Sequence, residues 1–328
     1  MDRRKFLSLG AGAAVVPILQ GRVAFAQAGY PQGPIRLIVP YAAGGVVDAV
    51  ARHWAEAVKT SLGTVVVENQ GGGGGTIGAA AVSRAKPDGQ TLLFGDTSNL
   101  VIAPHVMKNL TYDPAKDFAP ASLVATSSTA IVVHPSVPAK TLSEFIEYAK
   151  ANQKTMSYAS AGSGTVTHLA GELFKQLIKA PDITHIPYRG AGPGLNDLLG
   201  GTVPMMTPNV TGPVLGFHRA GKVRILAVCA PQPLKAASDI PAAVSILPGL
   251  VVQLTAGVAA PAGTPDAVIA KIAAATAQAL KDEKFVKALE AAGLESRTDA
   301  SPAAAKSYLE SERQRLIPVI KAAGLQPA

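Results

Sequence analysis

The stretch IRLIVPYAAGGVVDAVARHWAEAVKTSLG, residues 35–63, contains the signals that decide the fold. Its β-branched run Ile35–Val39 predicts a buried strand that ends at Pro40. A turn of small residues follows, and the apolar spacing over 46–62 predicts a helix that ends at Gly63. A strand, a glycine-containing turn and a helix in this order predict the start of a parallel βαβ unit.

The same alternation continues along the chain. Further strands are expected at 64–68, 91–95, 157–159, 184–188, 203–206 and 222–229, and helices at 77–85, 142–150, 165–179, 191–199, 266–281, 283–292 and 302–322. Two long extended segments, 119–134 and 250–260, bracket the central series. We therefore expect an α/β protein with two lobes joined by two crossing strands. A ligand cleft is expected between the lobes, at the carboxyl ends of the strands.

The composition of the 328 residues excludes several classes of protein. Hydrophobic residues make up 48% and charged residues 16%, which is typical of a globular chain. Aromatic residues reach only 5%, which argues against a stacking surface for sugars or single-stranded nucleic acid. The net charge is +8, but beyond Arg3-Arg4-Lys5 no run of Lys or Arg stands out, so nucleic-acid binding is not expected.

The first residues have the features of a secretion signal. Asp2-Arg3-Arg4-Lys5-Phe6-Leu7 is a twin-arginine pattern, and an uncharged apolar stretch covers residues 7–19. Small-residue cleavage motifs follow at 24–26 and 26–28. The apolar stretch is shorter than the roughly 20 residues that span a bilayer. We therefore expect residues 1–26 to be a cleaved signal peptide of an exported protein.

The cysteine and the histidines favour neither a disulfide nor a metal site. Cys229 is the single cysteine and ends the apolar run 223–229, so we expect it to fill the core. The six histidines have no ligand spacing such as HxxxH. Ser163 lacks the outer glycines of a nucleophile elbow. We therefore expect no catalytic residue, no metal and no cofactor.

Two turns are candidates for ligand binding, at residues 40–45 and 160–165. Each leaves a predicted strand and begins a predicted helix with small residues, which exposes backbone N–H groups at the positive end of the helix dipole. A carboxylate suits such donors, and one turn from each lobe would clamp it. His168 lies on the first turn of the second helix. Asp48 lies at the start of the first helix, where it is expected to accept backbone N–H bonds and orient the loop.

The glycine run offers an alternative. Residues 73–78, GGGTIG, match the dinucleotide pattern GxGxxG, and Asp96 follows Gly78 by 18 positions. This spacing would fit an exported nucleotide-dependent oxidoreductase. Any run of five glycines meets the pattern easily, however, and the run lies in the second βα turn, whereas the fingerprint belongs to the first.

Several ordered motifs resemble those of the substrate-binding proteins of tripartite tricarboxylate transporters, also called the Bug family. The resemblance covers essentially the whole chain after the signal. The motifs are IRLIVP at 35–40, GGxxD at 44–48 with Arg52, KPDGxTLL at 86–93, YDxxKDF at 112–118, HPSVP at 134–138, YASAGSGT at 158–165, PYRGAGP at 187–193 and APAGTP at 260–265.

The resemblance implies a monomeric periplasmic-binding-protein (Venus flytrap) fold with two mostly parallel sheets flanked by helices. Residues 29–128 and 252–328 would form lobe 1, and residues 129–251 lobe 2. It implies a periplasmic protein that captures a small carboxylate, with aromatic and dicarboxylic acids among the candidates. The ligand would pass to membrane subunits of a tripartite tricarboxylate transporter. A binding protein that signals to a sensor partner would have the same sequence features.

The resemblance also implies the ligand-binding residues. Those of the two loops are Ala43, Gly44, Gly45, Ser160, Gly162, Ser163, Gly164 and Thr165. By position the site extends to Tyr41, Asp48, Thr76, Thr97, Ser98, His168, Tyr188 and Asn209. One departure matters for the ligand: Val46 and Val47 stand where the family often has Ser or Thr. This wall is expected to be drier, which favours a ligand with an apolar or aromatic body.

Overall fold

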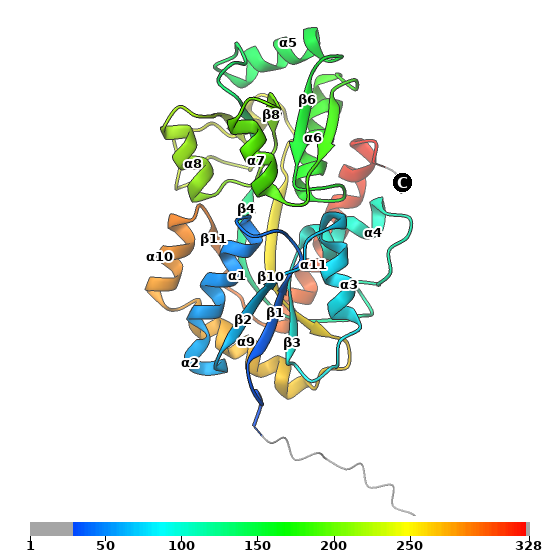
Figure 1. Cartoon of the computed structure of the whole chain (residues 1–328), viewed down its shortest axis with the longest axis vertical. Helices are drawn as coiled ribbons and strands as arrows, with labels where there is room; N and C mark the ends of the chain where they lie inside the picture. Colours follow the sequence, from blue (N-terminus) through cyan, green and yellow to red (C-terminus); the bar gives the residue numbers. More distant parts are fainter. Residues whose placement is uncertain (1–28, 326–328) are drawn as a thin grey trace, which may run out of the picture.

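The computed structural model describes residues 29–325, and the predicted signal peptide at 1–26 lies outside them. Figure 1 shows two lobes stacked along the long axis, with two long strands running between them. We call the part built on the six-stranded sheet lobe 1 and the part built on the five-stranded sheet lobe 2.

Lobe 1 contains the first strand–turn–helix unit. Its sheet has the order β11-β4-β10-β3-β1-β2, formed by β1 (Ile35–Val39), β2 (Val65–Asn69), β3 (Thr91–Asp96), β4 (Phe118–Ser128), β10 (Gln253–Pro261) and β11 (Glu295–Ser296). Its helices are α1 (Val46–Ala57), α2 (Lys59–Leu62), α3 (Thr76–Ser83), α4 (Ala103–Val106), α9 (Asp266–Ala279), α10 (Glu283–Ala291) and α11 (Pro302–Ala322). A 3-10 turn, η1 (Gly73–Gly75), and a π-helical turn, η2 (Ser98–Ile102), complete the lobe.

Lobe 2 holds the central series of strands and helices. Its sheet has the order β7-β6-β8-β5-β9, formed by β5 (Ala130–Val133), β6 (Ser157–Ser160), β7 (Thr184–Pro187), β8 (Met205–Met206) and β9 (Arg224–Val228). Its helices are α5 (Leu142–Asn152), α6 (Val166–Ile178), α7 (Ala191–Leu199) and α8 (Gly212–Arg219), with a 3-10 turn, η3 (Ala243–Ser245). Helix α11 of lobe 1 extends upward and packs against α6 (Figure 1).

Both sheets are mixed, so the expectation of mostly parallel sheets was wrong in this detail. Strand β1 pairs in parallel with β2 and β3, and β6 with β7 and β8. The crossing strand β10 is antiparallel to β3 and β4, and β5 is antiparallel to β8 and β9. The helix–strand alternation correctly predicts the parallel part. The crossing segments enter the sheets without a crossover helix, which permits antiparallel pairing.

The two crossings are bonded to each other at the lobe boundary. The chain leaves the first sheet after Ser128, and Thr129 donates from its N–H to the carbonyl of Val252 at 3.1 Å. Cys229 donates to the carbonyl of Thr129 at 2.7 Å and accepts from the N–H of Val252 at 3.0 Å. Cys229 is fully buried, as expected of a core residue. These bonds join the two crossings, and residues 129–251 remain the proposed extent of lobe 2.

Helix α1 shows how the sequence directs the core. Val46, Val47, Val50 and Trp54 recur at helical spacing and are buried against the sheet. The indole N–H of Trp54 donates to Thr276 Oγ1 at 3.0 Å. The helix was predicted to run to residue 62, but it breaks at Val58 before α2 begins.

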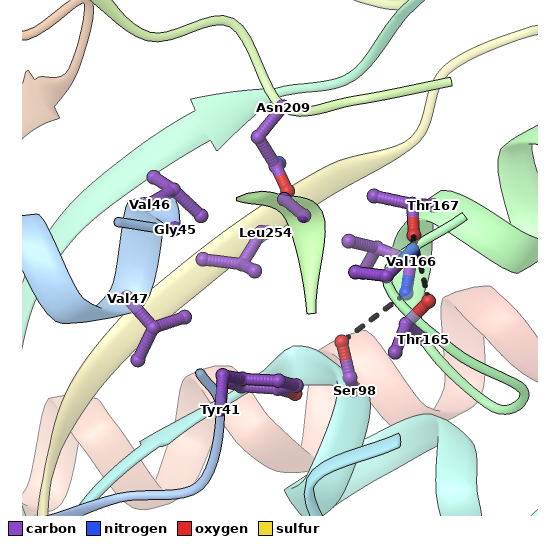
Figure 2. A pocket seen from close by; sticks show the side chains of 12 residues that line it. Tyr41, Gly45, Val46, Val47, Ser98, Thr165, Val166, Thr167, Asn209 and Leu254 are labelled. Atoms are coloured by element: carbon purple, nitrogen blue, oxygen red, sulfur yellow. Dashed lines mark hydrogen bonds between the residues drawn. The ribbon is translucent and has the colours of Figure 1, made fainter. Parts of the chain in front are cut away.

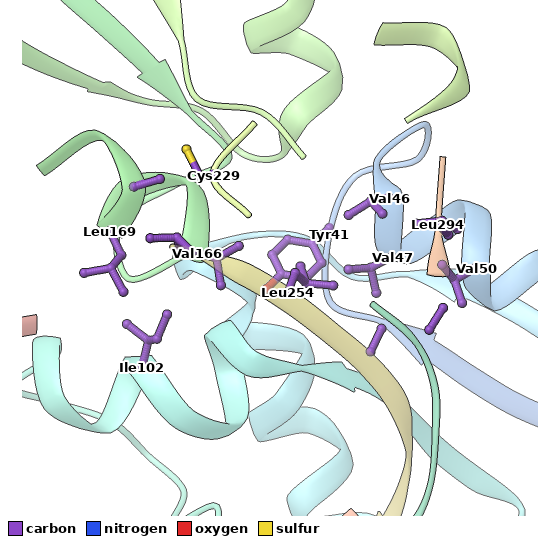
Figure 3. Packing of buried hydrophobic residues seen from close by; sticks show 14 of the residues in the cluster. Tyr41, Val46, Val47, Val50, Ile102, Val166, Leu169, Cys229, Leu254 and Leu294 are labelled. Atoms are coloured by element: carbon purple, nitrogen blue, oxygen red, sulfur yellow. The ribbon is translucent and has the colours of Figure 1, made fainter. Parts of the chain in front are cut away.

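One apolar cluster continues from lobe 1 into lobe 2. In Figure 3, Tyr41 and Leu254 lie between Val46 and Val47 of α1 on one side and Val166 and Leu169 of α6 on the other. The lobes are therefore in apolar contact around the cleft.

None of the helices within residues 29–325 is long and apolar enough to cross a membrane. Helix α8 and the turns η2 and η3 were not expected from the sequence.

Candidate ligand-binding site

The first loop is fixed by one carboxylate. Asp48 Oδ2 accepts the N–H of Gly44 at 3.0 Å and Arg52 Nε at 3.1 Å, while Oδ1 accepts Asn69 Nδ2 at 2.9 Å. Burial tends to raise the pKa of Asp48, but the hydrogen bonds from Arg52, Gly44 and Asn69 together outweigh it and lower the pKa below its usual value. Asp48 thus accepts a backbone N–H, as predicted, and orients the loop.

We expect Asp48→Asn to destabilise the protein by about 2 kcal/mol, because a neutral amide cannot accept from all three donors and a charged acceptor is lost. Urea unfolding of the variant measures this. Glu56→Gln, on the same helix, is the control: Glu56 is exposed and pairs with Lys59 at 3.8 Å, so its loss should have little effect. Equal stability of the two variants would contradict the loop-orienting role.

The second loop is organised by hydroxyl groups at the start of α6. Thr165 is the N-cap residue, and its Oγ1 accepts the N–H of His168 at 3.2 Å and donates to the carbonyl of Gly162 at 2.7 Å. Ser160 Oγ, at the end of β6, accepts the N–H of Gly162 at 3.1 Å. The Thr167 hydroxyl accepts the N–H of Ala161 at 2.9 Å. The turn is therefore held by bonds made within the lobe.

A stacked pair of histidines supports this loop from within lobe 2. The rings of His168 and His185 lie 4.0 Å apart between centroids, at 16° to each other. His168 Nδ1 accepts the N–H of Gly164 at 3.2 Å, and His185 Nε2 lies 2.7 Å from Ser160 Oγ. Burial lowers the pKa of His168 to about 4 and that of His185 to about 3. Both rings are therefore neutral near pH 7; His168 accepts a backbone N–H, and His185 stacks on it and bonds to the Ser160 hydroxyl.

A small cavity lies between the two loops (Figure 2). Residues from both lobes line it: Tyr41, Gly45, Val46, Val47, Ser98, Ala161, Thr165, Val166, Thr167, Ala191, Asn209 and Leu254. Within the described part of the chain, none of the lining side chains is charged. Five of the residues expected from the sequence are among them: Tyr41, Gly45, Ser98, Thr165 and Asn209.

The other expected residues lie around the cavity rather than on its wall. They are Ala43, Gly44, Asp48, Thr76, Thr97, Ser160, Gly162, Ser163, Gly164, His168 and Tyr188. Several have partners of their own. Thr76 donates to the carbonyl of Gly73 at 2.8 Å, Thr97 Oγ1 accepts the N–H of Thr255 at 3.0 Å, and the Tyr188 hydroxyl donates to Asp197 at 2.6 Å. Their side chains support the loops and strands that surround the cleft.

Five lining residues were not expected: Ala161, Val166, Thr167, Ala191 and Leu254. Val166 and Thr167 are the first residues of helix α6. Their position directly after the glycine-rich turn could have predicted that they line the cavity. Leu254 comes from the crossing strand β10, and its place depends on the sheet pairing of Gln253–Pro261 with β3 and β4.

Contacts across the cleft show that the lobes are closed on each other. Ser98 Oγ of lobe 1 accepts the N–H of Val166, the first residue of α6, at 3.1 Å (Figure 2). A Cβ atom placed on Gly74 of lobe 1 would overlap the carbonyl oxygen of Ser163 in lobe 2. One placed on Gly190 of lobe 2 would lie 3.2 Å from Ala42 Cβ. Glycines therefore allow the closed contact.

Asp96 is the buried charged group next to this contact. It ends β3, is 1% exposed, and accepts Asn99 Nδ2 at 3.2 Å as well as the N–H of Ser98. Burial raises the pKa of Asp96 above its usual value. A further negative charge placed near Asp96 would be unfavourable, because burial disfavours charged groups there.

Comparison with known proteins gives consistent matches over the described chain. The model of the family described as "Tripartite tricarboxylate transporter family receptor" matches residues 50–325. A UPF0065 protein of Bordetella pertussis is 34% identical over 304 residues, which cover 91% of this chain and 92% of that protein.

Solved structures agree in fold. The periplasmic binding protein BugD is 35% identical with a TM-score of 0.87, over 91% of this chain and 100% of that one. MatC from Rhodopseudomonas palustris, solved with bound malate, is 31% identical with a TM-score of 0.84, over 89% of this chain and 100% of that one. The two-lobed fold expected from the sequence is therefore confirmed.

Proposed function

Because this chain belongs to the tripartite tricarboxylate transporter receptor family, we propose that it captures a small carboxylate in the cleft between its lobes and delivers it to membrane subunits of such a transporter. Members of this family are periplasmic solute-binding proteins rather than enzymes. The oxidoreductase suggested by the glycine run is therefore set aside. In this proposal residues 1–26 direct export to the periplasm, and the protein acts there as a monomer.

The observation that carries the proposal is the uncharged cavity between two helix-opening loops, one from each lobe. The N–H groups of Val46 and Val47 lie in the first turn of α1, where the chain provides no intrahelical acceptor. Together with the dipole of a 12-residue helix, they favour an anionic oxygen. Asn209 adds an amide from lobe 2. MatC, which shares the fold at 31% identity, has malate bound, and this supports a carboxylate.

We expect carboxylates to raise the melting temperature of the mature protein, whereas neutral sugars should not. A ligand at about 100 times its Kd adds roughly 2.7 kcal/mol to stability, which corresponds to roughly 5 °C in a protein of this size. Thermal unfolding with single mono-, di- and aromatic carboxylates measures the shift, and calorimetry gives the Kd. A shift with sugars and none with any carboxylate would refute the proposed function. Pull-down of membrane partners with and without ligand distinguishes transport from sensing.

A further inference from the structure

We propose that the ligand has a single carboxylate and a compact apolar body, and that Val46, Val47 and Leu254 select it over dicarboxylates. This inference rests on the proposed function and makes it more specific. It would distinguish this protein from MatC, whose bound malate carries two carboxylates.

The first argument is the chemistry of the wall. Val46 and Val47 lie on one side of the cavity in Figure 2, and Leu254 of the crossing strand reaches in beside them. All three side chains are at least 94% buried. Val166 and Ala191 add further apolar surface from lobe 2. An apolar ligand body would bury its surface here favourably, whereas a polar one would lose its water without gaining partners.

The second argument is the number of free polar groups. The Thr165 and Thr167 hydroxyls lie 2.7 Å apart and bond to each other and to the backbone of their own loop. Ser98 Oγ already accepts the N–H of Val166. The donors left on the wall are the N–H groups in the first turns of α1 and α7 and the amide of Asn209, which makes one long bond of 3.5 Å to Ser127 within the described residues. All of these donors are neutral, so they can bind one carboxylate but supply no cation to balance a second.

The third argument is charge. A second carboxylate inside the closed cleft would face no lining Lys or Arg within the described residues, and Asp96 lies buried next to Ser98. An unpaired buried carboxylate is strongly disfavoured. A single carboxylate avoids this cost, because the N–H groups of α1 act as partial positive charges beside it.

Two matched pairs of acids, titrated by calorimetry into the mature protein, test the inference. Pentanoate and pentanedioate share the same five carbons, and benzoate and 1,4-benzenedicarboxylate share the same ring. We expect the Kd of the monoacid to be at least about tenfold lower than that of the diacid in at least one pair. In neither pair should the diacid bind more tightly than the monoacid. A diacid that binds as tightly or more tightly would overturn this inference and leave the proposed function standing. If no carboxylate of any class binds, the proposed function fails first.

A substitution tests whether the apolar wall causes the preference for monoacids. Val47→Thr keeps the shape of the side chain and adds a hydroxyl, so it should reduce the monoacid preference at least about threefold. Val50→Thr is the matched control: Val50 lies one turn further along α1, is 1% exposed and does not line the cavity. It should lower stability and leave the ratio unchanged. An unchanged ratio in Val47→Thr would overturn the role assigned to this residue.

Discussion

Replacing Gly74 with alanine is expected to weaken carboxylate binding by about 100-fold or more while both lobes stay folded. Gly74 has φ +63°, and a Cβ atom there would overlap the backbone carbonyl oxygen of Ser163 across the cleft. A backbone atom cannot move aside as a flexible side chain can, so the lobes would have to stay apart. The ligand would then lose the contacts from one lobe, which is a loss of several kcal/mol. Calorimetry measures the affinity, and small-angle scattering measures closure.

Gly73→Ala provides the matched control. Gly73 is the neighbouring glycine of the same turn and has φ +57°, so alanine is strained there to a similar degree. Its Cβ atom would meet Thr76 Oγ1 of the same lobe at 2.5 Å, and that side chain can rotate. This variant should lose stability but keep most of its affinity. Equal affinity in the two variants would show that closure does not depend on the contact of Gly74 with Ser163.

The sequence allowed the first strand–turn–helix unit and the role of Asp48 to be predicted, because both depend on local spacing. A carboxylate four residues after Gly44 can reach back to its N–H within one helical turn, and the structure has this bond at 3.0 Å. The parallel pairing of β1 with β2 and β3 follows from the helices between them. Local patterns of this kind need no information about distant residues.

Other parts of the site depend on contacts between distant residues. Leu254 reaches the cavity because β10 pairs with β3 and β4, strands that precede it by more than 120 residues. His185 meets His168 because β7 pairs with β6, which brings the two rings together although they lie on different elements. The bond from Ser98 to Val166 exists only in the closed arrangement of the lobes. No local pattern in the chain predicts these contacts.

The stacked histidines give the largest expected dependence on pH. The pKa values of His168 and His185 are about 4 and about 3 in the folded protein, against an ordinary value of 6.5. Well above pH 6.5 both rings are neutral in either state, so they contribute nothing to the pH dependence there. As the pH falls below 6.5, the unfolded chain binds two protons that the folded protein does not, and stability falls. The expected loss is about 2 to 3 kcal/mol per pH unit between pH 6 and pH 5, measured by urea unfolding at each pH.

The surroundings of the pair explain why the rings resist protonation and supply the control. Burial is the main reason that both rings resist a proton. Lys175 also opposes a proton on either ring, while Glu172 favours one on His168 and bonds Lys175 at 2.9 Å. His168→Asn and His185→Gln keep a polar group near each lost nitrogen and cannot titrate. The double variant should lose most of the slope between pH 6 and pH 5. Asp48 and other carboxylates with lowered pKa act mainly below that window, since their ordinary values lie near 4. An unchanged slope in the double variant would mean that groups other than this pair cause the acid sensitivity.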